Sequence, residues 1–98
     1  MQLIIKVIEI KGKCPVYHIG DKIVLQKGYI LDPKETDTVC MHSLVSILPF
    51  YVALSKGVKA KDIGLAKRNS NEAYVQCLDP CDLTDGGTVS FEISRVDR

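Results

Sequence analysis

Residues 2–11 read QLIIKVIEIK, and this stretch organises the predicted fold. Ile, Leu and Val dominate it, and only Lys6 and Glu9 interrupt the apolar run. A segment that is largely apolar on both of its alternating faces is typical of a strand near the centre of a sheet. Gly12 and Pro15 follow and break it. The sequence therefore predicts a central strand at the N-terminus.

Four further segments complete a predicted sheet of about five strands, and they cover residues 22–26, 29–31, 73–77 and 88–96. Gly28 allows a tight turn between the first two, which predicts a hairpin. The last segment alternates, with Val89, Phe91 and Ile93 on one side and polar residues on the other. That alternation is typical of a half-buried antiparallel strand. We therefore expect an antiparallel, possibly mixed, sheet.

One main helix is predicted between these strands, from about Thr38 to Gly57. Asp37 or Thr38 can cap its first free N–H groups, and Gly57 can end it in the left-handed conformation. Pro49 lies inside this helix, so a kink or break around residues 45–49 is expected. The predicted fold class is therefore α+β, with a small sheet packed on one Pro-interrupted apolar helix.

The predicted helix is apolar on nearly every side, so it must be covered on nearly every side. One small sheet covers only one face. We therefore expect residues 43–54 to contact another copy of the chain, giving a homo-oligomer, or to dock onto a larger protein. The alternative is that residues 58–71, a predicted loop with one helical turn, fold back over the helix.

Composition and charge argue against several classes of protein. Lys and Arg number 13 against 12 Asp and Glu, giving a formal net charge of +1, which does not favour nucleic-acid binding. No stretch approaches the roughly 20 apolar residues that span a bilayer, and the N-terminus lacks the features of a signal peptide. We expect a single cytoplasmic domain, residues 1–98, with reduced cysteines. One group of cations is expected to be a solvated face: Lys56, Lys59, Lys61, Lys67 and Arg68.

Cysteine and histidine residues are the candidates for chemistry, and they are Cys14, His18, Cys40, His42, Cys77 and Cys81. Cys14 and His18 lie in a predicted loop between strands. Cys40 lies in the predicted first helical turn, where backbone N–H groups favour a thiolate, and Cys77 ends a strand. Because element ends often gather at one edge of a small domain, these side chains can meet. Zinc and iron–sulfur clusters take such ligands, so the sequence indicates a metal site.

Two other interpretations of these residues stay open. The cysteines can be small buried hydrophobic residues without function, in an assembly or interaction subunit. Alternatively, Cys40 can be the reactive thiol of a redox or small-molecule enzyme, with Cys77 or Cys14 as its partner. His42 is a weaker ligand candidate, because residues two apart on a helix point in different directions. The sequence identifies no catalytic residue and no Gly-rich phosphate-binding motif.

The pattern of these residues resembles a family of small uncharacterised bacterial and archaeal proteins. The shared features are Gly12-Lys13-Cys14-Pro15, His18, Gly20-Asp21, Cys40 before a helix with Leu48-Pro49, Gly57 after it, and Cys77 with Asp79-Pro80. The family implies no activity, but it implies which positions matter. Those on its pattern are Cys14, His18, Cys40 and Cys77, whereas Cys81 and His42 do not match it. The resemblance therefore implies a Cys₃His metal site, for zinc or an iron–sulfur cluster.

Overall fold

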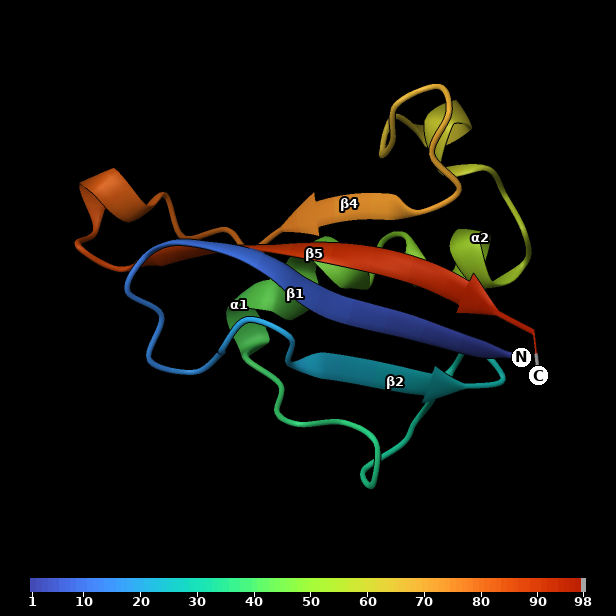
Figure 1. Cartoon of the computed structure of the whole chain (residues 1–98), viewed down its shortest axis with the longest axis horizontal. Helices are drawn as coiled ribbons and strands as arrows, with labels where there is room; N and C mark the ends of the chain where they lie inside the picture. The colour runs from blue at the N-terminus through green and yellow to red at the C-terminus, as the bar shows by residue number, and fades with distance from the viewer. Residues whose placement is uncertain (98) are drawn as a thin grey trace.

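A five-stranded antiparallel sheet forms the frame of the molecule in the computed structural model, which describes residues 1–97. Its strand order is β3-β2-β1-β5-β4. Two short helices lie against one face of this sheet (Figure 1). In chain order, the elements are β1 (Gln2–Gly12), β2 (Lys22–Gln26), β3 (Ile30–Leu31), α1 (Met41–Ile47), α2 (Tyr51–Ser55), the 3₁₀ helix η1 (Ala60–Ile63), β4 (Ala73–Gln76), the 3₁₀ helix η2 (Cys81–Leu83) and β5 (Gly87–Val96). The predicted α+β class is confirmed.

Strand β1 lies at the centre of the sheet, as the apolar run at the N-terminus predicts. It pairs antiparallel with β2 on one side and with β5 on the other. Leu3, Ile5 and Val7 are fully buried beneath the helices. The opposite face is less covered, because the helices lie on one side only, and Ile8 there is 41% exposed. Strand β1 is therefore apolar on both faces but buried on one.

Strand β5 follows the predicted alternation, and it supplies the other half of the core. Val89, Phe91 and Ile93 are all at most 2% exposed, while the residues between them are only partly buried. Every strand pair described in residues 1–97 is antiparallel, so the sheet is not mixed. The predicted hairpin of β2 and β3 is also present, with Gly28 between them at a φ of +83°.

The predicted single helix is divided into α1 and α2, and Pro49 lies between them as expected. Its predicted start is wrong, because α1 begins only at Met41, after an extended Cys40 (φ −94°, ψ 131°) without a side-chain cap. The Asp37 carboxylate instead accepts the N–H of Lys22 at 2.9 Å, which ties the incoming loop to β2. Gly57 follows α2 with a φ of +88°, as predicted.

One face of the two helices stays uncovered. Its four apolar side chains are each more than half exposed: Met41, Val45, Leu48 and Val52. Residues 58–71 do not cover it; they contain η1, whose Ala60 is buried in the core, and the exposed stripe remains. Within residues 1–97, no helix combines the length and the apolar character needed to cross a membrane.

Candidate functional site

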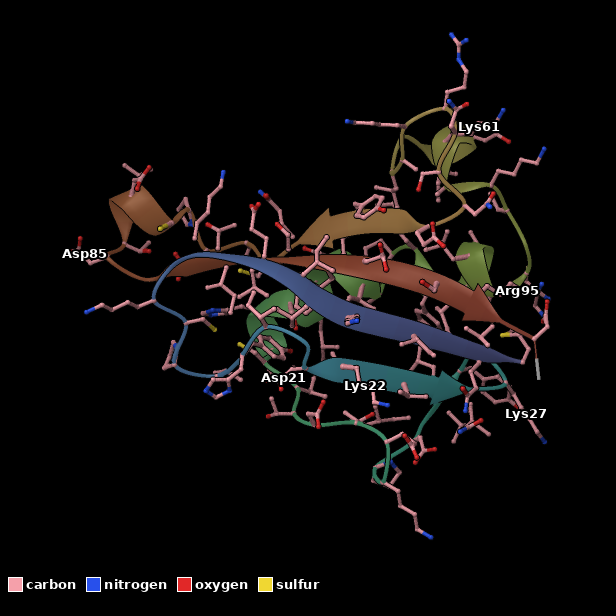
Figure 2. All side chains as sticks on the ribbon, viewed as in Figure 1. Asp21, Lys22, Lys27, Lys61, Asp85 and Arg95 are labelled. Atoms are coloured by element: carbon pink, nitrogen blue, oxygen red, sulfur yellow. The ribbon has the colours of Figure 1, made fainter. Side chains whose placement is uncertain are left out.

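A cavity of about 290 Å³ lies at the end of the sheet where three segments meet. They are the loop after β1, the start of α1, and the chain between β4 and β5, and Figure 1 shows them at the same end of the molecule. In Figure 2, the label Asp21 marks the loop after β1, and the label Asp85 marks the chain between β4 and β5. Five of the side chains lining the cavity are able to bind a metal ion: Cys14, Cys40, His42, Cys77 and Asp79. Thus residues far apart in the sequence share one space.

Tyr17 connects the two segments that carry Cys14 and Cys40. Its backbone N–H donates to Cys14 Sγ at 3.3 Å, and its hydroxyl accepts the backbone N–H of Cys40 at 2.8 Å. Ser43 Oγ donates to the carbonyl of Cys40 at 2.6 Å. Because this uses the only proton of Ser43 Oγ, the Tyr17 hydroxyl is the donor in their 2.8 Å hydrogen bond. The three residues thus form a closed chain of hydrogen bonds.

The aromatic ring of Tyr17 is held by the core beneath the cavity. It packs edge-on against Phe91, with ring centroids 5.4 Å apart and planes at 85°. Burial raises the pKa of the Tyr17 hydroxyl, and the hydrogen bonds from Cys40 and with Ser43 only partly oppose this. The hydroxyl therefore keeps its proton at neutral pH, as the donation to Ser43 requires.

Cys77 is fixed from the other side by β5. Its backbone N–H donates to the carbonyl of Val89 at 2.9 Å, which extends the pairing of β4 with β5 by one residue. Its Sγ accepts the N–H of Val89 at 3.3 Å and lies 3.6 Å from the carbonyl oxygen of Gly87, to which the thiol donates. The side chain is 6% exposed. Cys77 therefore forms a buried wall of the cavity.

Asp79 also lines the cavity and carries a stabilised negative charge. Its carboxylate accepts the hydroxyl of Thr84 and the backbone N–H of Cys81. The Thr84 bond is the main reason why the pKa of Asp79 is lowered; backbone N–H groups and the positive charge of His42 add to this against the opposing effect of burial. A Cβ atom at Gly86 would overlap the carboxylate, so a larger residue there would displace it. Asp79 and His42 therefore line the same cavity, with the carboxylate favoured in its ionised form.

The lowered pKa of Asp79 predicts a contribution to stability at neutral pH that is lost in acid. A group whose pKa is lower in the folded state stabilises the protein above its unfolded pKa of about 4, and this is lost as pH falls through the folded pKa. We expect Asp79→Asn to lower the free energy of unfolding at pH 7, and the difference from wild type to shrink between about pH 5 and 2. Urea titrations across this range measure it. Asp82→Asn, in an exposed position of the same loop, is the control and should change little; a pH-independent effect of Asp79→Asn would contradict the prediction.

The predicted ligands Cys14, Cys40 and Cys77 line the cavity, but His18 does not. The side chain of His18 is 88% exposed, and its Nδ1 lies 3.7 Å from the Asp21 carboxylate. The turn around it is closed by Asp21, which accepts the His18 N–H at 2.8 Å. Since Tyr17 takes the inward position, the next residue points to solvent. His42, the weaker candidate, is the imidazole that lines the cavity.

Cys81, the other weaker candidate, lies outside the lining of this cavity. Its Sγ is 3.6 Å from the carbonyl oxygen of Gly86, and it packs so closely on Gly12 that a Cβ there would overlap it. All four cysteines are free thiols in the described chain. As the side chains stand, residues 1–97 contain no three Cys, His, Asp or Glu groups arranged to hold one metal ion.

The position of His42 follows from where the helix begins. Residues two apart on a helix diverge, and on that ground Cys40 and His42 are a poor ligand pair. Cys40, however, is extended and precedes α1, so the helical rule does not apply to this pair. Positions 39 and 40 are Val and Cys, which are not strong capping residues, so the sequence gives no signal for this later start.

Comparison with known proteins supplies neither a family nor a function. The chain matches no protein-family model, no curated protein and no solved structure. The resemblance to small bacterial and archaeal proteins therefore stays a prediction.

Proposed function

We propose that this protein binds a zinc ion or an iron–sulfur cluster in the thiol-lined cavity, through Cys14, Cys40 and Cys77 with His42 as the fourth ligand. The observation that carries the proposal is that three thiols from three separate segments line one small space. Thiolate and imidazole are the ligands that zinc and iron–sulfur clusters prefer. His42 replaces His18 in this set because it lines the cavity, whereas His18 is exposed on the far side of a turn.

The surroundings of the sulfur atoms also suit metal ligation. Backbone N–H groups donate to the sulfur of Cys14 and to that of Cys77. Such bonds stabilise the negative charge of a thiolate, and in metal sites they tune the centre. Convergence on one ion requires new side-chain rotamers, since the thiols are not gathered around a single point. It requires no new fold, because all of these side chains border the same cavity.

The direct test is the metal content of protein purified without oxygen. Elemental analysis is expected to find about one zinc per chain, or iron with sulfide, and the visible spectrum separates these cases because an iron–sulfur protein is brown. Absence of stoichiometric metal, together with no zinc uptake by the reduced apoprotein, would defeat the proposal. In that case, rapid alkylation of Cys40 but of no other cysteine would favour the alternative of a thiol-redox or small-molecule enzyme.

We also propose that the exposed helical stripe of Met41, Val45, Leu48 and Val52 joins two copies of the chain. Beside it lies a second hollow of about 210 Å³, whose described lining is mostly apolar, carries no charged side chain and includes Leu48. An uncharged apolar surface is complementary to itself, which a two-fold contact requires. Exposed apolar surface of this kind usually marks an interface.

We expect Leu48→Lys to dissociate this dimer. Burying a Leu side chain contributes roughly 1.5–3 kcal/mol, and a two-fold contact buries it twice, so the dissociation constant should rise at least about 100-fold. Sedimentation velocity measures this. Leu83→Lys is a matched control, because Leu83 is 86% exposed and lies on η2, away from the stripe. A wild-type protein that stays monomeric at about 100 μM would disprove the interface.

A further inference from the structure

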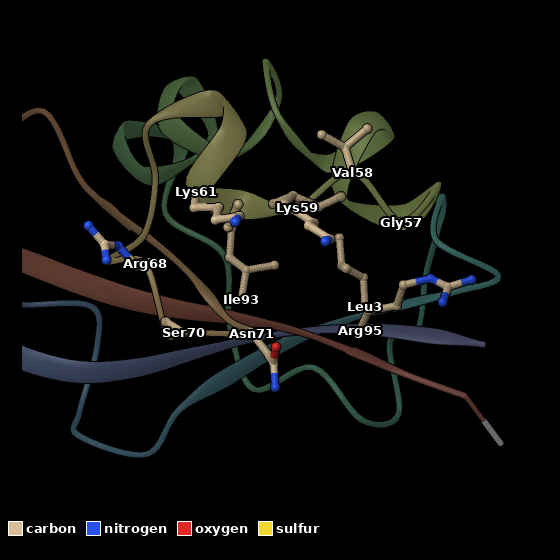
Figure 3. Close-up of a pocket in the computed structure, with 12 residues that line it drawn as sticks. Leu3, Gly57, Val58, Lys59, Lys61, Arg68, Ser70, Asn71, Ile93 and Arg95 are labelled. Carbon is tan, nitrogen blue, oxygen red and sulfur yellow. The ribbon is translucent and has the colours of Figure 1, made fainter.

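A third cavity, of about 320 Å³, lies between the chain after α2 and the outer ends of β1 and β5. It shares no lining residue with the thiol-lined cavity. Figure 3 shows Lys59 and Lys61 over its middle, above Leu3 and Ile93. Arg68 lies on one side and Arg95 on the other. The cavity is thus a separate, positively charged site.

The charge around this cavity is of one sign. Its four cations are Lys59, Lys61, Arg68 and Arg95, and the described lining contains no carboxylate. Three of them come from the segment that the sequence predicts to be a solvated face. Arg95 comes from β5, so the fold adds a cation that the local sequence does not contain. Close like charges repel one another, and a bound anion would relieve that repulsion.

Little within the protein neutralises these cations. Arg95 alone among them pairs with an acid in the described chain, Asp97, at 3.0 Å. Its Nε donates to the carbonyl of Ser55 at 3.1 Å, which anchors its stem beside the cavity. Lys59 and Lys61, on either side of the buried Ala60, have exposed side chains and no ion pair in residues 1–97. Their ammonium groups are therefore available to a ligand.

The floor of the cavity differs from its rim. Leu3 and Ile93, from the sheet, and Leu54, from α2, are buried core residues that line it. The amide of Asn71 adds a neutral polar group at the edge. An apolar floor under a cationic rim suits a molecule with an anionic head and a small apolar body. The volume lies at the lower end of the range for small-molecule sites, roughly 300–1,000 Å³.

We propose that this cavity binds a small organic phosphate, with the phosphate between Lys59 and Lys61 and the organic part on the apolar floor. A phosphomonoester carries up to two negative charges and several acceptor oxygens. A group of cations therefore binds it better than it binds a ligand with a single carboxylate. A nucleic-acid backbone fits less well, because the cations surround one bounded hollow and do not form a stripe, in a chain of net charge +1. The site does not involve the cysteines, so this proposal is independent of the metal proposal.

Isothermal titration of the full chain with phenyl phosphate and with inorganic phosphate tests this site. We expect saturable binding of phenyl phosphate at sub-millimolar concentration, weaker binding of inorganic phosphate, and a melting temperature that rises with added ligand. The double variant Lys59→Gln/Lys61→Gln should bind phenyl phosphate at least about tenfold more weakly. Both side chains are exposed, so this variant should remain folded, which circular dichroism checks.

The matched control is Lys56→Gln/Lys67→Gln, which removes the same charge from the same segment but outside the cavity lining. It should retain wild-type affinity. An equal loss of affinity in both double variants, or no saturable binding of either phosphate, would overturn the proposal. Tighter binding of a short single-stranded RNA that depends equally on all four lysines would overturn it too, in favour of a nucleic-acid surface.

Discussion

The Cys40→Ser variant is expected to contain less than about a tenth of the metal found in wild-type protein. Loss of a residue that supports a ligand lowers metal affinity about 10–100-fold, and loss of a direct ligand should lower it further. Cys40 is the most informative of the three thiols. It is only partly buried and lies outside α1, so the smaller hydroxyl leaves the fold intact. Its backbone N–H, which bonds to Tyr17, is unchanged by the substitution. Metal analysis and circular dichroism on the same sample separate lost ligation from lost folding.

The two histidines and Cys81 provide the controls for this experiment. His42→Ala also removes a direct ligand and should weaken metal binding by more than about 100-fold, whereas His18→Ala and Cys81→Ser should leave it unchanged. This contrast depends on the placement of His42 at the cavity and of His18 in an exposed turn. Loss of metal in His18→Ala with retention in His42→Ala would favour the ligand set with His18 that the family resemblance implies. Wild-type metal content in Cys40→Ser would exclude this cavity altogether.

The strands could be predicted because their signals are local. Val89, Phe91 and Ile93 alternate with polar residues, and the observed burial follows that alternation directly. The exposure of Ile8 could not be predicted in the same way. It depends on how many layers cover the sheet, and with helices on only one face, an apolar residue on the other face stays partly open. The same limit explains the uncovered helical stripe.

The site was harder to predict because it depends on side-chain direction. Sequence spacing brings His18 close to Cys14, but the turn directs Tyr17 inward and His18 outward. The role of Tyr17 has no signal of its own in the sequence, since a lone Tyr in a loop is an ordinary residue. Its two hydroxyl bonds reach Cys40 and Ser43, which are distant in the chain. Only the tertiary fold makes this link between the thiol-bearing segments.

Phe91→Ala is expected to lower the free energy of unfolding by about 3–5 kcal/mol, the usual cost of removing a buried aromatic ring. Phe91 is 0% exposed and lies on β5 opposite Val7 on one side and Val75 on the other. Total stabilities of such domains are about 5–15 kcal/mol, so the variant should melt at least about 12 °C lower, or fail to fold. Thermal and urea denaturation measure the change. Tyr74→Ala removes an aromatic ring from the exposed side of β4 and should cost less than about 1 kcal/mol.

The Phe91→Leu variant tests whether packing in the core supports the thiol-lined cavity. Leucine fills much of the space but removes the edge-on contact with Tyr17, which contributes roughly 0.5–1.5 kcal/mol beyond burial. If that contact positions Tyr17, and Tyr17 in turn positions Cys14 and Cys40, the folded Phe91→Leu protein should bind metal several-fold more weakly than wild type. Titration with zinc under conditions where both proteins are fully folded measures this. Unchanged affinity in a folded Phe91→Leu protein would mean that the hydrogen bonds of the Tyr17 hydroxyl hold the thiol-bearing segments without help from the core.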